Sequence, residues 1–272
     1  MNMTDRTDFF TDCFEEDGAK ENLHQQTTAP RKSVVQIHFP ARNMTLSYYN
    51  DQFNLKRGDS VYVDGKLEGL RGRVVDVNYN FKIKLSDYKR VIAKVDTEVS
   101  GQFFLAGSHL VSFDRNALPV DKVTLWFKAP SIDEDEYTSG SDDSFFCLEN
   151  LEDMDVSYMV MARGEEYYKS NRVKYLCVDD THGHAIVEGS SIYDVEFEYC
   201  DGKILGLTCS CFCGGNCKHE VAVMLQLREI LNLIEGHYQE KYDDTGYFSA
   251  ILEGVFFNIA IDGKRSGSLI LE

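Results

Sequence analysis

Apolar and polar residues alternate in several short stretches of the first half of the chain. Successive side chains of a β-strand point to opposite faces, so each alternating stretch is predicted to be a strand. Dipeptides rich in glycine and aspartate separate the stretches, as the turns between strands require. The predicted strands are residues 34–39, 59–63, 72–77 and 79–85. Short strands at this spacing predict a small β-barrel.

A second group of strands is predicted in the C-terminal half of the chain, at residues 173–178, 184–187, 193–199 and 204–209. The dipeptide Asp201-Gly202 separates the last two and is typical of the tight turn of a β-hairpin. Ahead of these strands, residues 159–168 fit either a helical turn or a strand.

The hydrophobic period changes after His219. Apolar side chains at positions 221, 224, 225, 227, 231 and 234 recur at the spacing of one helix face, which predicts an amphipathic helix of about 16 to 22 residues. Gly236 is a suitable end for this helix. The tail returns to strand-like patterns at residues 256–261 and 267–271, and an Asp-Gly dipeptide between them predicts a terminal hairpin.

These patterns divide the chain into five parts. Residues 1–30 are polar without a sustained period and are expected to form a disordered arm. Residues 129–156 contain ten Asp and Glu and no Lys or Arg, which is typical of an acidic linker. The remaining parts are a barrel domain at residues 31–128, a second domain at 157–235 and C-terminal strands at 236–272. The predicted fold class is α+β, mostly β.

Charge is distributed unevenly over the 272 residues. The net charge is −17, yet residues 31–128 contain 16 Lys and Arg against 10 Asp and Glu. A basic block in an acidic protein is a candidate surface for an anionic partner. The first residues show no signal peptide, and no apolar run approaches the roughly 20 residues that span a bilayer. We therefore expect a cytoplasmic protein without a membrane partner.

Half of the eight cysteines are clustered. Four of them lie within nine positions, and His219 follows two residues later. Thiolates and an imidazole at this density are typical ligands of a tetrahedral zinc ion (Zn²⁺), whereas disulfide frameworks belong to secreted chains. The clustered cysteines are Cys209, Cys211, Cys213 and Cys217.

The spacing within this cluster predicts two pairs of ligands. Cys209 and Cys211 are two residues apart and share one face of a strand. Cys217 and His219 are two residues apart at the start of the predicted helix, after a glycine-rich reversal of the backbone. Four protein ligands leave no open position on the metal, so a structural zinc site is expected. A set in which Cys213 replaces Cys209 is the chemical alternative.

The pattern C-x-C, five residues, C-x-H resembles the SWIM-type zinc finger. Further matches to that family lie upstream, at Arg163-Gly164, Tyr167-Tyr168, Tyr193 and the turn at residues 187–190. The resemblance covers residues 157–235. It implies a ββα finger with extra strands, in which Cys213 belongs to a variable loop. The zinc ligands that it implies are Cys209, Cys211, Cys217 and His219.

The same resemblance implies a role in recognition. SWIM fingers contact DNA or proteins, and they occur in transposases, recombination factors and bacterial remodelling-type ATPases. The expected partner is therefore a protein, DNA or both, in association with a remodelling ATPase or recombination machinery. Residues 157–235 contain 7 basic and 12 acidic side chains. This balance favours protein contact for the finger, because DNA affinity depends on phosphate neutralisation.

The first domain resembles SH3-like barrels of the KOW type and the barrel of bacterial PSP1-type proteins. The matching residues are Gly58-Asp59 ahead of one predicted strand and Gly72-Arg73-Val74 at the start of the next. The resemblance implies an SH3-like fold. Its surplus of positive charge makes nucleic-acid binding an alternative function of the protein. The candidate residues are Arg57, Lys66, Arg71, Arg73, Lys82, Lys84, Lys89 and Arg90.

No catalytic sequence motif accompanies these features. The leading interpretation is a non-enzymatic, zinc-binding recognition protein without a small-molecule substrate. A thiol-redox role for Cys209 and Cys211 is the one chemical alternative.

Overall fold

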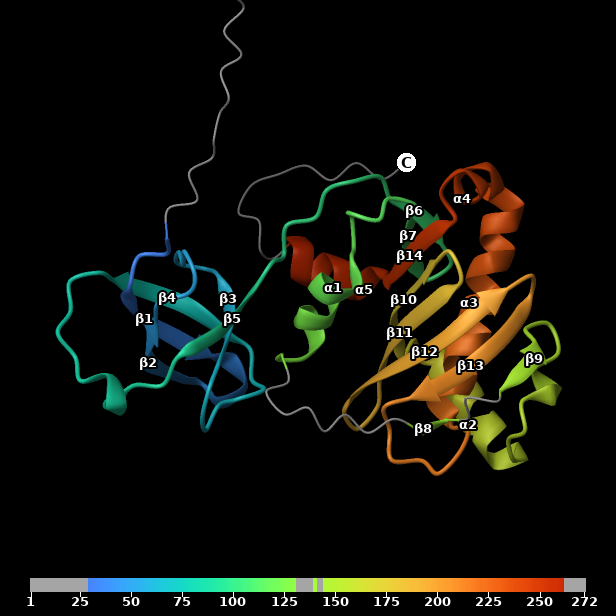
Figure 1. The fold of residues 1–272 in the computed structure, drawn as a ribbon, viewed down its shortest axis with the longest axis horizontal. Helices are drawn as coiled ribbons and strands as arrows, with labels where there is room; N and C mark the ends of the chain where they lie inside the picture. The colour runs from blue at the N-terminus through green and yellow to red at the C-terminus, as the bar shows by residue number, and fades with distance from the viewer. Residues whose placement is uncertain (1–28, 131–138, 141–143, 262–272) are drawn as a thin grey trace, which may run out of the picture.

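The computed structural model describes residues 29–130, 139–140 and 144–261, which form a mixed α+β fold with two antiparallel sheets (Figure 1). Most of the predicted N-terminal arm lies outside the described residues. So do the predicted turn at residues 262–263 and the predicted strand at 267–271.

The first sheet has five strands in the order β2-β1-β4-β3-β5. The strands are β1 (Ser33–Phe39), β2 (Met44–Asn50), β3 (Ser60–Val63), β4 (Gly72–Asn78) and β5 (Val91–Val95). Alternate side chains on the inner face of this sheet make its core, because every second residue of a strand points the same way. The fully buried members of that core include Val35, Ile37, Phe39, Val61, Val63 and Val74.

The first sheet is open, and the predicted closed barrel is not formed. Its two edge strands, β2 and β5, come together at a single bridge between Tyr49 and Arg90. The Tyr49 N–H donates a hydrogen bond to the Lys89 carbonyl at 2.9 Å beside that bridge. A closed barrel requires a continuous ladder between its first and last strands, and one bridge does not supply it.

The prediction of a strand at residues 79–85 is wrong. This stretch is a loop that leads into a single 3₁₀ turn, η2 (Leu85–Asp87). No side chain from Tyr79 to Leu85 is buried, so its alternating pattern has no core to face. The fifth strand is β5, and its Val91, Ala93 and Val95 are buried.

The second sheet has nine strands, and its centre confirms the four strands predicted for the C-terminal half. Asp201 and Gly202 form the predicted hairpin turn with φ of 49° and 76°, the left-handed values that such a turn requires. The order is β6-β7-β14-β10-β11-β12-β13-β8, with β9 also paired to β13. The strands are β6 (Phe104–Ala106), β7 (His109–Ser112), β8 (Ser139–Gly140), β9 (Phe145–Cys147), β10 (Val173–Asp179), β11 (His182–Glu188), β12 (Ile192–Cys200), β13 (Lys203–Cys209) and β14 (Tyr247–Leu252).

Strand pairing crosses the domain boundaries that the sequence predicts. Strands β6 and β7 precede residue 128, yet β7 pairs with β14 in the second sheet. Strands β8 and β9 lie in the predicted linker, and both pair with β13. Four apolar side chains of the same segment are buried in the second core: Phe146, Leu148, Leu151 and Met154. The described residues of this segment after residue 138, namely 139–140 and 144–156, are therefore part of the folded unit.

Helices cover both faces of the second sheet (Figure 1). They are α1 (Val120–Phe127), α2 (Tyr158–Lys169), α3 (Lys218–His237), α4 (Gln239–Thr245) and α5 (Glu253–Phe256). On β10, Leu176 and Val178 pack in the cluster that contains α3. The alternate residues Tyr175 and Cys177 pack in the cluster that contains α1 and α5. The period of two along the strand thus builds one core on each face.

Helix α3 confirms the predicted amphipathic helix and extends one residue beyond Gly236. Residues 159–168, for which helix and strand both fitted, are helical in α2. The predicted strand at residues 256–261 is instead helical, in α5 and the π-helical turn η4 (Phe257–Ile261). Phe256 and Ala260 are four residues apart and both are buried, which is helical spacing.

The core on the α1 side joins the two sheets. Tyr62, Ala93 and Val95 of the first sheet belong to the same buried cluster as residues of α1 and α5. Trp126, the only tryptophan of the chain, is 3% exposed in this cluster. Its indole N–H donates to the Asp96 carbonyl at 2.7 Å, and its own carbonyl accepts from Arg71 at 3.2 Å. The two sheets therefore share buried apolar surface and hydrogen bonds.

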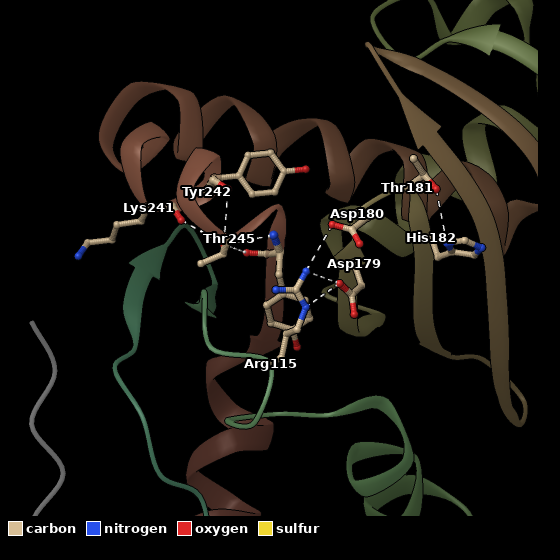
Figure 2. A network of polar contacts seen from close by, with 9 residues as sticks. Arg115, Asp179, Asp180, Thr181, His182, Lys241, Tyr242 and Thr245 are labelled. Atoms are coloured by element: carbon tan, nitrogen blue, oxygen red, sulfur yellow. Dashed lines mark hydrogen bonds and ion pairs between the residues drawn. The ribbon is translucent and has the colours of Figure 1, made fainter.

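Arg115 binds the β7–α1 loop to the turn between β10 and β11 (Figure 2). Its Nε donates to the Asp179 carboxylate at 2.8 Å, and its Nη2 lies 3.4 Å from Asp180 Oδ1. The hydrogen bond that Arg115 donates to Asp179 raises the pKa of the Arg115 guanidinium above its ordinary value. Such exposed pairs contribute little stability.

Among the described residues, no helix is both long and apolar enough to cross a membrane.

His109 on β7 gives the fold a predictable dependence on pH. The ring is fully buried, its Nε2 lies 3.1 Å from the Val173 carbonyl, and burial lowers its pKa from 6.5 to about 4. The unfolded chain therefore binds a proton at a higher pH than the folded chain does. Stability from the neutral ring is complete above pH 6.5 and is lost as the pH falls toward 4.

We expect the unfolding free energy of the wild type to fall by about 2 kcal/mol more than that of His109→Gln between pH 7 and pH 5. Gln retains a donor for the Val173 carbonyl but does not titrate. Urea unfolding of both proteins at the two pH values measures the difference, in which titration of all other groups cancels. Parallel pH profiles would contradict a neutral buried ring.

Candidate metal centre

The four predicted ligands come from the end of one strand and the start of one helix. Strand β13 ends at Cys209, and Cys211 lies just beyond it. Cys217 is the N-cap of α3, with an extended backbone, and His219 lies in the first turn of that helix. The β12–β13 hairpin and α3 therefore deliver two ligands each, as the C-x-C and C-x-H spacings predict.

The structure brings these four side chains together in a buried cluster. One ligand atom from each of Cys209, Cys211, Cys217 and His219 lies within 4.8 Å of all the others, and the residues are 1–4% exposed. The Nδ1 of His219 is 3.7 Å from the Cys209 sulfur and 3.6 Å from the Cys217 sulfur. Ligands of a tetrahedral zinc ion, with bonds of about 2.3 Å to sulfur and 2.0 Å to nitrogen, are about 3.5 Å apart. The cluster can therefore hold a metal ion.

The electrostatics of the cluster favour a bound cation. The contact with the Cys217 thiol, burial and the other nearby sulfurs raise the pKa of Cys209 far above its ordinary value. Burial, assisted by Lys218, lowers the pKa of His219 to about 4 and keeps its imidazole neutral. A neutral imidazole can ligate a metal, and thiolates crowded in a buried site need a positive charge to compensate them.

The residues that carry the family resemblance surround the His219 ring. Tyr193 stacks on it with ring centres 4.4 Å apart, and Tyr167 contacts it edge-on at 5.4 Å. A side chain at Gly189 would come within 3.1 Å of the His219 Nε2 atom. Lys218 lies 4.6 Å above the Tyr167 ring. The aromatic rings and the glycine turn thus fix the orientation of the imidazole.

Glu220 is a part of the site that the sequence reasoning missed. Its carboxylate accepts a hydrogen bond from the Cys217 N–H at 2.7 Å, which completes a capping box at the start of α3. The side chain is fully buried, and burial raises its pKa to about 8. A Glu three residues after an N-cap is the sequence signal that predicts this contact.

Cys213, the alternative ligand, lies outside the cluster. It is exposed, in the loop between the two ligand pairs. Partial burial and the adjacent Cys211 raise its pKa to about 11, which makes it a weakly reactive thiol. The geometry therefore matches the set with Cys209, and the alternative set with Cys213 is not assembled.

The predicted acidic linker lies next to the metal cluster. In strand β8, Ser139 pairs with Cys209 and Gly140 pairs with Thr208. On the side of β12, the Ser210 N–H donates to the Asp194 carbonyl, and the Asp194 N–H donates to the Ser210 hydroxyl, both at 2.9 Å. The first ligand pair is consequently held by neighbours on both sides.

The predicted nucleic-acid residues do not all line one cleft. Arg57, Arg71 and Arg73 line a single cleft of about 750 Å³ between the first sheet and η4. Two further lysines of that cleft, Lys56 and Lys94, were not predicted. The other candidates, Lys66, Lys82, Lys84, Lys89 and Arg90, do not line it. Arg90 instead pairs with Asp51 at 3.1 Å and stacks over Tyr49.

Comparison with models of protein families, with curated proteins and with solved structures finds no match for this chain. The resemblance to a SWIM-type finger consequently remains an expectation from the spacing of the cysteines and histidine and from the residues around His219.

Helix α2 packs closely against the first turns of α3, the helix that carries His219. A Cβ atom at Gly164 would lie 2.3 Å from Val221 Cγ1 and 3.2 Å from the Lys218 carbonyl, so no larger residue fits. We expect Gly164→Ala to lower the unfolding free energy by about 1–3 kcal/mol through overpacking.

Gly236→Ala is the matched control, because Gly236 lies in α3 with nothing within 4 Å of the added methyl group. This variant should raise the unfolding free energy by up to about 1 kcal/mol. Urea unfolding of the metal-loaded proteins measures both effects. Equal effects of the two substitutions would show that the helices are not in contact at Gly164.

Metal content tests the ligand set directly. We expect one zinc ion per chain in the wild type and in Cys213→Ser, and loss of zinc in Cys217→Ser, which removes a buried donor. Elemental analysis with a chelator titration measures the content. Hydrogen exchange should show protection lost over residues 204–235 in Cys217→Ser only. Loss of zinc in Cys213→Ser with retention in Cys209→Ser would instead select the alternative set.

Proposed function

We propose that this chain is a non-enzymatic recognition protein in which the Cys₃His cluster binds a structural zinc ion as a SWIM-type finger. The observation that carries the proposal is the buried cluster itself. Four protein donors complete a tetrahedral shell, and residues that are 1–4% exposed leave no open position for a substrate. Sulfur and imidazole donors in this combination favour zinc among the common metals.

A zinc ion at this cluster would join the end of β13 to the start of α3. Cys209 and Cys211 would bind it from the hairpin, and Cys217 and His219 from the helix. The loop at residues 210–216 would then be held at both ends. Bound zinc supplies positive charge that stabilises the buried thiolates, and in small fingers this is worth roughly 10–16 kcal/mol.

Two observations support a protein partner for the finger. The unit from residue 157 to 235 has 7 basic and 12 acidic side chains, which disfavours a phosphate backbone. The loop between the ligand pairs also presents Phe212, an aromatic side chain that is 85% exposed. Exposed aromatic side chains are enriched in protein interfaces. We propose that the partner has an apolar pocket for Phe212 and belongs to a remodelling ATPase or recombination complex, as the family resemblance implies.

The thiol-redox alternative has less support. Cys209 and Cys211 are buried, and the pKa of Cys209 is raised, whereas reactive thiols are accessible and have a lowered pKa. A redox pair would be isolated without metal and would cycle with dithiol reagents.

Site-specific cross-linking tests the recognition role. A photoreactive phenylalanine analogue at position 212 should give one discrete protein adduct in the native host, because that side chain is held at the interface. The same analogue in a Cys217→Ser background should lose the adduct, since the loop is then released. The control places the same analogue at Tyr79, an exposed aromatic residue that follows β4 of the first sheet, where no such adduct should form. Adducts with nucleic acid at position 212, or adducts that persist in Cys217→Ser, would contradict the proposal.

A further inference from the structure

A basic cleft lies at the junction of the two sheets, away from the metal cluster. Its walls are the turn before β3, the start of β4, the end of β5 and the helical turn η4. Its volume of about 750 Å³ falls within the range of about 300–1,000 Å³ that is usual for ligand sites. Two of its lining residues, Arg71 and Asp96, are hydrogen-bonded to Trp126 of the buried junction, which fixes part of the cleft wall.

Positive charge is in excess in the cleft. Five cationic side chains line it: Lys56, Arg57, Arg71, Arg73 and Lys94. Three acidic side chains also line it: Asp59, Asp96 and Glu98. The balance that a ligand would meet depends on which of these charges are already paired.

Two of the three acids are paired with lysines. The Asp59 carboxylate is 7% exposed, accepts the Lys56 N–H at 2.9 Å and lies 3.1 Å from the Lys94 ammonium. Asp96 lies 2.9 Å from Lys122, which is not part of the cleft wall. Glu98 is then the one remaining acid among the described lining residues, and Lys56, Arg57 and Arg71 outnumber it. The cleft is therefore suited to an anion.

The cleft also has space at its backbone. Gly58 has a φ of 98°, a left-handed value that favours glycine, and no atom lies within 4 Å of where its side chain would be. Gly72 between the two arginines faces inward, because a Cβ there would lie 2.3 Å from Ile37. Arg71 and Arg73 consequently extend on the outer side of β4, about 7 Å apart along the strand. Both arginines line the cleft, and the Arg71 guanidinium also donates to the Trp126 carbonyl at 3.2 Å.

Among the residues that the structure describes, none with an aromatic side chain lines the cleft. Proteins that read single-stranded bases use aromatic side chains as stacking platforms, whereas the sugar–phosphate backbone is bound by Lys and Arg. The cleft thus has the groups that recognise phosphate and lacks those that recognise bases. We infer that it binds the phosphodiester backbone of a nucleic-acid strand without base selectivity.

Fluorescence provides a reporter for this cleft. Trp126 is the only tryptophan, and its backbone and ring are hydrogen-bonded to Arg71 and to Asp96 of the cleft wall. A strand in the cleft should change the Trp126 emission, whereas binding elsewhere on the chain should not. The experiment uses the full, zinc-loaded chain with a fluorescein-labelled oligothymidylate, followed by anisotropy and by Trp126 emission.

We expect binding at low salt that weakens with a log–log salt slope of about −3 if four phosphates are contacted. Arg57→Gln with Arg73→Gln should reduce the magnitude of that slope by about 1.4 and weaken binding at least tenfold at 50 mM salt. Lys32→Gln with Lys169→Gln removes the same charge from exposed positions outside the cleft and should change affinity less than twofold. Oligoadenylate should bind as oligothymidylate does.

Four results would overturn the inference. The first is no binding at 25 mM salt, and the second is binding without a change in Trp126 emission. The third is equal weakening by Lys82→Gln with Lys84→Gln, which would place the strand on the exposed loop instead. The fourth is full displacement of the oligonucleotide by polyglutamate or pyrophosphate at equal charge concentration, which would indicate an acidic peptide or a small phosphate as the ligand. Circular dichroism of each variant establishes that its fold is intact.

Discussion

The convergence of three cysteine sulfurs and one imidazole at a buried point is the constraint on which the second half of the molecule depends. Thiolates in such a place repel one another and lose their hydration, so the arrangement is favourable only with a cation among them. The binding energy of a structural zinc ion, roughly 10–16 kcal/mol, is comparable to the whole stability of a domain. A metal ion bound by this cluster would also fix the start of α3 against the end of β13. Because α3 packs on one face of the nine-stranded sheet in the same buried cluster as the three cysteines, a bound metal and that core would stabilise each other.

The other face of the same sheet joins the two halves of the protein. Alternate residues of β10 point to opposite faces, so Tyr175 and Cys177 reach the core that also holds Tyr62 and Trp126. This shared core couples the first sheet to the second through buried apolar surface, whereas a flexible linker would leave the two halves independent. The basic cleft lies at this junction and has walls from both halves of the chain. Its geometry is therefore determined by the fold, as a binding site requires.

Local patterns in the sequence predict the local parts of this structure. The four strands from β10 to β13 are neighbours in sequence and in space, and their hairpins follow from alternation and from Asp201-Gly202. The residues of the Cys₃His cluster were predictable for the same reason, since only nine residues separate Cys209 from His219. Long-range pairing was not predictable, because nothing in β7 indicates that β14 is its neighbour. The apolar run at residues 256–261 fits a strand or a helix equally, and only the buried positions of Phe256 and Ala260 select the helix. The residues of the basic cleft are distant in sequence and come together only when the chain folds. The sequence therefore indicated a basic region, but not which of its residues line the cleft.

The uneven distribution of charge explains how a strongly acidic chain can offer a cationic site. The chain has 45 Asp and Glu, but only 10 of them lie in residues 31–128, and two of the three in the cleft are paired with lysines. Charges separated by more than about 8–10 Å interact weakly at physiological salt. The electrostatic potential in the cleft is therefore determined mainly by the charged residues that line it, including Arg57, Arg71 and Arg73. The Asp and Glu of residues 157–235 act mainly on molecules that approach that part of the chain. A protein built in this way can hold a phosphate backbone at one place and repel it at another. In the proposed functions, that separation would orient a strand in the cleft relative to the protein that contacts the loop at residues 210–216.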